Sequence, residues 1–178
     1  MLTVLGKDRP GIVAGVTGVL FQEGCNLEDA SMTILEGEFA MIMVVCLRDE
    51  RKRKRIQSKL ALLGKRGHLT FFWKELPGKL SRGKKHKAGS VPHLISVMGR
   101  DRTGIVYRTS RLLAKNRLNI TDLNCQILGQ KSKAIYMMLL EVDVPKGFSL
   151  KSLERNLSAL GHKLGIELRI KPVERIEF

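Results

Sequence analysis

The sequence has few of the residues that build metal centres, disulfide frameworks or catalytic sets. It contains three cysteines, an odd number without metal-ligand spacing. Such cysteine usage favours a reducing compartment, so we expect a cytoplasmic protein. The four histidines share no spacing with one another or with the cysteines, and no nucleophile–base pair stands out. The sequence therefore predicts neither an enzyme nor a site for a metal ion or another cofactor.

Long apolar runs are also missing. The longest, residues 39–47, is far shorter than the roughly 20 residues of a membrane-spanning helix. The N-terminal residues lack the basic and apolar pattern of a secretory signal. We therefore expect no membrane partner. Because Cys46 lies inside that apolar run, we expect it to be a core residue.

Positive charge, by contrast, is in excess and is unevenly distributed. The formal net charge is +15. Residues 48–87 carry a net charge of +12, whereas residues 1–47 carry −4 and residues 88–178 carry +7. The basic run at residues 51–55 is interpreted as a solvated helix face. In the alternative, it forms a phosphate-binding patch together with Arg82, Lys84, Lys85 and Lys87.

Aromatic residues make up only 5% of the chain, and none interleaves with the basic run. Stacked recognition of single strands is therefore not indicated. No helix-turn-helix or zinc finger is visible either. Weak, nonspecific nucleic-acid binding is the most that the basic segment predicts.

One octapeptide occurs twice. The residues GKDRPGIV begin at Gly6, and GRDRTGIV begins at Gly99, an offset of 93 residues. The same offset relates Asn26 to Asn119. This spacing has the length of a small domain and is too long for a solenoid repeat.

The repeat predicts two domains, at residues 1–76 and 91–178. Between them, residues 77–90 form a basic linker that begins with Pro-Gly and has almost no apolar residues. Because like charges repel and nothing apolar holds the segment down, we expect it to be mobile.

The octapeptide predicts a strand, a tight loop and the start of a helix. Gly6 and Gly11 allow sharp turns, and Pro10 suits the first position of a helix. Free N–H groups at a helix start favour an anion such as a carboxylate. Asp8 and Asp101 are interpreted as helix caps rather than general bases. Arg9 and Arg102 could grip a carboxylate or pair with a nearby acid.

Hydrophobic periodicity then predicts the order β-α-β-β-α-β in each copy, with residues 30–34 in a half-buried strand. This is an α+β, ferredoxin-like arrangement, in which a four-stranded antiparallel sheet carries both helices on one face. The expected elements of the first copy are residues 2–5, 10–23, 26–34, 39–47, 48–66 and 69–76. Those of the second copy are residues 94–98, 105–116, 119–128, 134–142, 150–164 and 166–173.

The first copy contains the octapeptide at residues 6–13, the pattern Gly-x-Asn-Leu-x-Asp at residues 24–29, and Gly-x-Phe-x-Met at residues 37–41. These three segments resemble the ACT domain. Two such domains with little else resemble the glycine cleavage system transcriptional repressor family. The resemblance covers nearly the whole chain.

The resemblance implies that domains pair edge to edge and bind a small amino acid at the seam. It places the ligand at the loop after the first strand and at an Asn that opens the second strand. Because a helix separates the two in sequence, Asn26 should face the loop of a paired domain. The implied residues are Gly6, Asp8, Arg9, Pro10, Gly11 and Asn26, with Gly99, Asp101, Arg102, Gly104 and Asn119 in the second copy.

The second copy departs from the pattern at Thr103, which replaces Pro10, and at Arg117, which replaces Gly24. As a whole, the resemblance implies a homodimeric, amino-acid-sensing regulator of transcription in amino-acid (glycine) metabolism, acting through a protein partner. Two alternatives stay open. The chain could be a basic nucleic-acid-associated protein that uses the ACT-like domains as scaffold, or the detached regulatory subunit of a biosynthetic enzyme.

Overall fold

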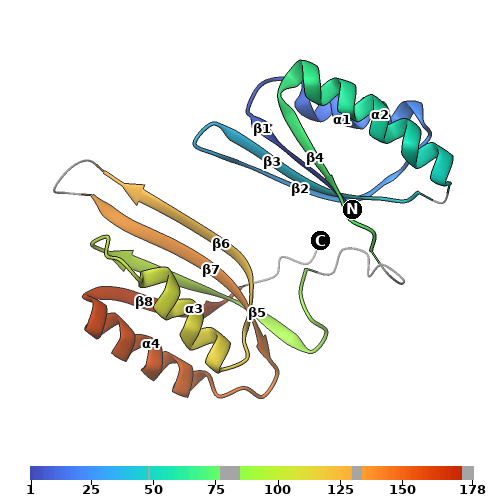
Figure 1. Ribbon diagram of the computed structural model, residues 1–178. Helices are drawn as coiled ribbons and strands as arrows, with labels where there is room; N and C mark the ends of the chain where they lie inside the picture. The colour runs from blue at the N-terminus through green and yellow to red at the C-terminus, as the bar shows by residue number, and fades with distance from the viewer. Residues whose placement is uncertain (48, 77–84, 130–133, 174–178) are drawn as a thin grey trace. The chain divides into compact units, whose positions relative to one another are not determined.

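The computed structural model describes residues 1–47, 49–76, 85–129 and 134–173 of the 178-residue chain. The chain divides into two compact units, Met1–Gly83 and Lys84–Phe178. Each unit has the element order β-α-β-β-α-β, so the predicted α+β fold with two ferredoxin-like units is confirmed (Figure 1).

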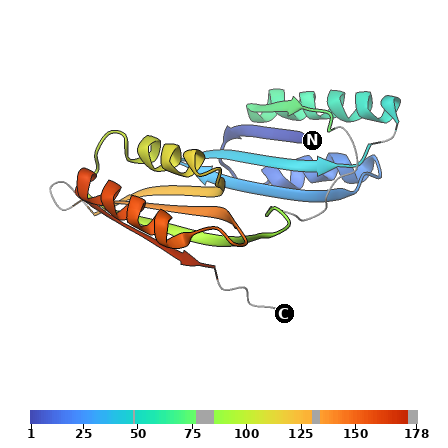
Figure 2. The same cartoon turned by 90° about the horizontal axis from the view of Figure 1, so that it is seen from below.

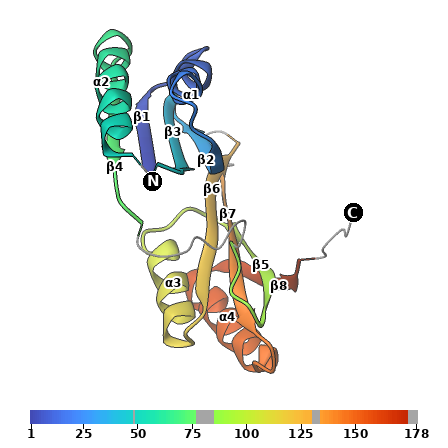
Figure 3. The same cartoon turned by 90° about the vertical axis from the view of Figure 1, so that its right-hand side faces the viewer.

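The first unit is a two-layer sandwich of one sheet and two helices. Its strands are antiparallel in the order β2-β3-β1-β4. Helices α1 and α2 lie beside each other on one face of this sheet (Figure 3). The elements are β1 (Leu2–Lys7), α1 (Ile12–Gln22), β2 (Leu27–Leu35), β3 (Glu38–Val45), α2 (Glu50–Gly67) and β4 (Leu69–Trp73).

The second unit repeats this arrangement. Its sheet has the order β6-β7-β5-β8, again antiparallel, and α3 and α4 cover one face of it (Figure 2). None of the helices in the described ranges is long and apolar enough to cross a bilayer. The elements are β5 (Ser90–Gly99), α3 (Ile105–Lys115), β6 (Asn119–Leu128), β7 (Ile135–Pro145), α4 (Leu150–Leu164) and β8 (Ile166–Pro172).

Alternation along the strands places apolar side chains on the helix-covered face. Val4 and Met41 are paired across β1 and β3, and both are buried. The helices turn a buried apolar stripe toward the same face, as the 3.6-residue period requires. The stripes consist of Ile12, Val16 and Leu20 in α1, Ile56 and Leu60 in α2, and Leu153 and Leu157 in α4.

Two burial predictions are wrong for the first unit. Strand β2 is exposed along most of its length rather than half-buried, with Met32 48% exposed and Ile34 51% exposed. The physical reason is its position at the edge of the sheet, because local alternation does not reveal whether a strand is central or at an edge. Cys46 is exposed rather than buried, because β3 ends at Val45.

The C-terminal part of the predicted linker is held against the second unit. His86 Nδ1 lies 2.8 Å from Asp143 Oδ1, and the Lys87 backbone N–H donates to Asp143 Oδ2 at 2.9 Å. Strand β5 already begins at Ser90. Carboxylates of β7 thus contact this end of the segment that we expect to be mobile; residues 77–84 lie outside the described residues.

Candidate ligand-binding site

The repeated octapeptide builds the same loop in both units. Helices α1 and α3 each begin after a left-handed glycine, Gly11 with φ 92° and Gly104 with φ 93°. Positive φ is costly for residues with a Cβ, which explains glycine at both positions. A Cβ on Gly11 would meet no atom within 4 Å, so the backbone angle and not a steric limit selects glycine there.

The start of each helix differs from the sequence prediction. Pro10 precedes the glycine that caps α1 and is not the first helical residue. Asp8 and Asp101 do not cap the helices, because no side chain accepts a hydrogen bond from either N-terminus. The glycine turn places the aspartates outside the capping position, and the Asp8 N–H donates instead to Gly37 O at 2.8 Å. The first-turn N–H groups therefore have no side-chain acceptor among the described residues.

Gly6 and Gly99 have a structural role. A Cβ on Gly6 would lie 2.8 Å from His68 O, and one on Gly99 would lie 3.0 Å from Ile166 Cα. Both glycines therefore permit close approach between the first and last strands of their units. This contact fixes the start of the loop next to the segment that joins the second helix to the last strand.

Arg9 and Arg102 also make a repeated contact. The Arg9 guanidinium packs over Gly67 at the C-terminal end of α2. The Arg102 guanidinium lies 3.5 Å from the position that a Cβ on Gly165 would take, at the end of α4. A cation is favourable there, because the C-terminal end of a helix carries a partial negative charge.

Asn26 and Asn119 lie far from the loops of their own units. Asn26 precedes Leu27, which pairs with Val45, whereas Gly6 pairs with Phe39 at the other end of β3. Six residues of strand separate these ends by roughly 20 Å. The Asn26 side chain is exposed and donates a hydrogen bond to Glu28 Oε1 at 3.4 Å.

Asn119 has the same kind of position in the second unit. Asn119 pairs with Asp143 of β7, and Asp143 in turn pairs with Pro92 of β5. Gly99 lies at the opposite end of β5. Asn119 lines a surface cavity of about 560 Å³, together with residues of α3 and of the start of β6. Neither asparagine can therefore reach a ligand at its own loop.

A cavity that the sequence reasoning missed lies next to the first loop. Its volume is about 430 Å³, and it is an open surface hollow between the end of β1 and the connection from α2 to β4. One sequence signal could have pointed to it. When the second helices of the two copies are aligned at an offset of 97 residues, His68 stands where the second copy has Gly165. The lining residues are Lys7, Asp8, Arg9, Arg66, Gly67 and His68.

The basic run of α2 is largely engaged within the first unit. Lys52 Nζ donates to Gly24 O at 3.2 Å, and Arg53 pairs with Glu50 at 2.9 Å and with Glu75. Arg55 contacts Glu23 at 3.0 Å, as does Lys59 at 2.8 Å. Hydrogen bonds from Lys59 and Arg55 lower the pKa of the Glu23 carboxyl. Two residues of the possible phosphate-binding patch, Lys52 and Arg55, thus hold α2 to the end of α1.

The described basic residues of the linker, Lys85 and Lys87, also contact acids of their own unit. Lys85 Nζ lies 2.9 Å from Glu141 Oε1 and 3.7 Å from Asp122 Oδ2. Lys87 binds Asp143 through its backbone N–H. Two nearby carboxylates therefore neutralise Lys85, while Arg82 and Lys84 lie outside the described residues.

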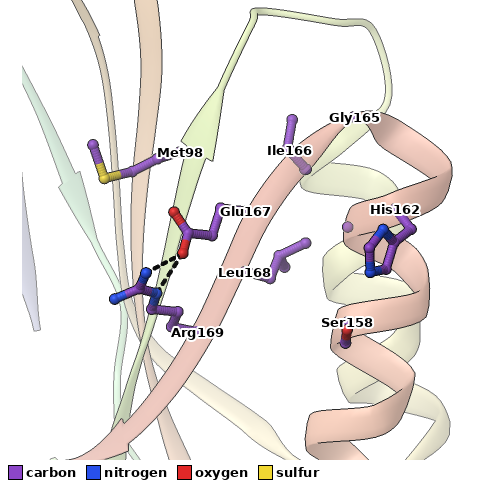
Figure 4. A pocket seen from close by; sticks show the side chains of 9 residues that line it. Met98, Ser158, His162, Gly165, Ile166, Glu167, Leu168 and Arg169 are labelled. Carbon is purple, nitrogen blue, oxygen red and sulfur yellow. Dashed lines mark hydrogen bonds and ion pairs between the residues drawn. The ribbon is translucent and has the colours of Figure 1, made fainter.

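A groove of about 600 Å³ lies between α4 and β8 of the second unit (Figure 4). Ile166 and Leu168 face α4, with Ser158 and His162 on the helix. Glu167 and Arg169 lie on the other side of β8, where they form an ion pair with each other. The lining residues of β8 point alternately to its two sides. The groove therefore does not bring polar groups together around one ligand position. Among the described residues, no group of three or more His, Cys, Asp or Glu side chains could hold a metal ion.

The two βαββαβ units, each with a glycine-led loop after its first strand, define the class of small ferredoxin-like α+β domains. The ACT domain profile matches residues 1–74 and 92–171, so the chain belongs to the ACT domain family. ACT domains are regulatory, bind small amino-acid ligands and often dimerise.

Relatives share parts of the chain or its fold. A UPF0237 protein of Methanopyrus kandleri is 53% identical over 26% of this chain and 52% of its own length. One from Methanosarcina mazei is 30% identical over 48% of this chain and 89% of its own length. The chain spans about half the length of the curated relatives that it first matches.

Two solved structures match nearly the whole chain. A protein of unknown function from Galdieria sulphuraria has a TM-score of 0.77, with 24% identity, over 97% of this chain and 96% of its own. A candidate glycine cleavage system transcriptional repressor has a TM-score of 0.70, with 23% identity, over 98% of this chain and 96% of its own. At 23% and 24% identity, this likeness shows that the proteins share the tandem fold, and it shows the fold alone.

Proposed function

We propose that the chain is a non-enzymatic, cytoplasmic regulator that senses a small amino acid. The observation that carries this proposal is the pair of glycine-led helix starts, at Gly11 and Gly104, whose first-turn N–H groups lack a side-chain acceptor. A free α-carboxylate can accept these hydrogen bonds and is favoured by the partial positive charge of the helix end.

The second half of the proposed site comes from a paired domain. Asn26 and Asn119 lie at the sheet ends away from their own loops, so each would meet a ligand only at the loop of another domain. An asparagine amide donates and accepts, so it can bind either end of a zwitterion. Pairing, within one chain or in a homodimer, is then a condition of amino-acid binding.

A ligand bound at such a seam can act as a signal. It stabilises the paired arrangement over other arrangements by its difference in affinity for them. The regulator would transmit this change to a protein partner. The likeness to a candidate glycine cleavage repressor supports regulation of transcription in amino-acid metabolism, with glycine as the first ligand to examine.

A thermal-shift screen of the full chain against the twenty amino acids tests this proposal. A ligand at a hundred times its Kd stabilises the folded state by about 2.7 kcal/mol, which raises the melting temperature by several degrees. We expect one or a few small amino acids to give this shift. No shift with any of them at millimolar concentration would contradict amino-acid sensing.

A further inference from the structure

We propose that the cavity between the first loop and the end of α2 binds a small dianion. This cavity, called here the loop–α2 cavity, is lined by Lys7, Asp8, Arg9, Arg66, Gly67 and His68. It lies on the β4 side of the loop, because Gly6 pairs with Leu69 there. The proposed amino-acid site is centred on the helix start after Gly11 and on an asparagine of a paired domain; the loop residues Asp8 and Arg9 are shared between the two proposals.

Charge is the first argument. Three cationic side chains, Lys7, Arg9 and Arg66, line the cavity together with one carboxylate, Asp8. Among the described residues, no ion pair within 4.0 Å joins any of the three cations to an acid. The end of α2 contributes about half a negative charge, which leaves the cavity positive. Two guanidinium groups and an ammonium suit a doubly charged oxyanion.

The second argument is that both copies carry the same charges. The residues Arg100, Asp101 and Arg102 of the second copy correspond to Lys7, Asp8 and Arg9. Lys163, in the last turn of α4, corresponds to Arg66 at an offset of 97 residues. Gly64 and Gly161 confirm this offset, because each packs against the first carbonyl of the last strand, at Leu69 and Ile166. A charge arrangement that recurs in both copies is expected of a binding site.

The third argument is the backbone of His68, which distinguishes the first copy. His68 has φ 51°, a left-handed conformation at the end of α2. The corresponding residue of α4 is Gly165, with φ 63°. Glycine adopts this conformation without cost, whereas a residue with a Cβ is strained. The first copy keeps a histidine at this place in spite of the strain, and His68 lines the cavity together with Lys7 and Arg66.

The same features select a small dianion over other ligands. The ammonium group of a free zwitterion would be repelled by three cations. A nucleic-acid backbone needs a stripe of free bases along the helix, but Arg53 and Arg55, near the start of α2, are already paired with acids. A cavity of about 430 Å³ accepts a small molecule. A phosphoryl group and a dicarboxylate share the required charge, so both are probes.

Calorimetric titration of the full chain at low salt and pH 7.5, with inorganic phosphate, succinate and glycine, tests the proposal. We expect phosphate or succinate to bind at this site, and whichever binds identifies the source of the dianion. Arg66→Gln should weaken that binding about tenfold or more. Lys65→Gln is the matched control, because Lys65 lies in the same helical turn but lines a different groove; it should change the affinity less than twofold.

His68→Gly separates a binding role from a structural one. Glycine relieves the left-handed strain, so the melting temperature should stay the same or rise, while dianion affinity should fall several-fold. A fall in melting temperature with unchanged dianion affinity would assign His68 a structural role and remove the third argument. Absence of binding by both dianions, or equal effects of Arg66→Gln and Lys65→Gln, would overturn the proposal. Asn26→Ala should leave dianion binding unchanged, so this proposal and the amino-acid site can fail separately.

Discussion

At the scale of single residues, the two copies form the same helix-ending turn with different residues at its left-handed position. Helices α1 and α3 both end in a turn in which a backbone N–H reaches the carbonyl five residues earlier. Cys25 N donates to Leu20 O at 2.9 Å, and Leu118 N donates to Leu113 O at 3.0 Å. The left-handed residue of this turn is Gly24 in the first copy but Arg117 in the second.

Replacing Arg117 by glycine should therefore stabilise the second unit. Arg117 has φ 57°, whereas Gly24 adopts φ 58° without a Cβ. We expect Arg117→Gly to raise the free energy of unfolding by about 0.5–1 kcal/mol, because relief of strain exceeds the entropy that glycine adds to the unfolded chain. Urea unfolding of the variant measures this difference. Destabilisation would mean that the Arg117 side chain makes a contact worth more than the strain.

The carboxylates that hold residues 85–87 predict a dependence of stability on pH. Burial by itself raises the pKa of Asp143, but hydrogen bonds from the Lys87 N–H and from His86 outweigh it and lower the pKa. A hydrogen bond from Lys85 lowers the pKa of Glu141, which also accepts from Thr121. Carboxyls with lowered pKa values stabilise the folded state above their ordinary pKa of about 4 and lose this effect as the pH falls below it.

We therefore expect the second unit to lose stability as the pH falls from 5 to 3, and Asp143→Asn to flatten that decline. Because Asp143 is only 3% exposed, the variant should also be less stable at pH 7, by about 1–3 kcal/mol. Denaturant unfolding at several pH values measures both effects. Asp122→Asn is the control, since its side chain is 68% exposed and its ion pair is long. An unchanged acid decline in Asp143→Asn would contradict the account.

At the scale of elements, the second helix of each unit packs closely against the last strand. Gly64 makes this possible in α2, because a Cβ there would lie 2.6 Å from Leu69 O. Gly161 has the same role in α4, at 2.7 Å from Ile166 O. The obstacle is backbone and not a flexible side chain, so it cannot move aside easily.

Gly64→Ala should cost about 1–3 kcal/mol of stability, since helix and strand must separate to admit the methyl group. Gly18→Ala in α1 is the matched control, because no atom lies within 4 Å of the new Cβ. There alanine should stabilise the helix by about 0.5–1 kcal/mol through its higher helix propensity. Thermal unfolding of both variants provides the comparison, and equal effects would contradict the packing argument.

Elements that depend on local pattern could be predicted from the sequence, whereas long-range positions could not. Periodicity predicted α4 at residues 150–164, which are its observed bounds. The start of α1 was misplaced because a left-handed glycine, Gly11, caps the helix where Pro10 was expected to begin it. The exposure of β2 depends on strand order, and the loop–α2 cavity depends on contacts between residues about 60 positions apart, such as Arg9 and Gly67.

At the scale of the whole molecule, the chain is a pair of similar units, each with an open sheet face and exposed edge strands. In the first unit, Ile42 and Phe72 are both about half exposed, at 48% and 55%, on the face away from the helices. Such surfaces are costly to leave in water, which favours pairing of the units or of two chains. The amino-acid site proposed here depends on such pairing, because each loop needs an asparagine from another domain.

Calorimetry of the wild-type chain and the Asn26→Ala variant, at matched oligomeric state and with the amino acid that the thermal screen identifies, tests this claim most directly. We predict that Asn26→Ala weakens binding by about 1–3 kcal/mol, the cost of a buried polar group left without its partner, and leaves the fold intact. Asn124→Ala, an exposed asparagine in the middle of β6, should bind as the wild type does. Equal affinities for the wild type and Asn26→Ala would contradict the paired site.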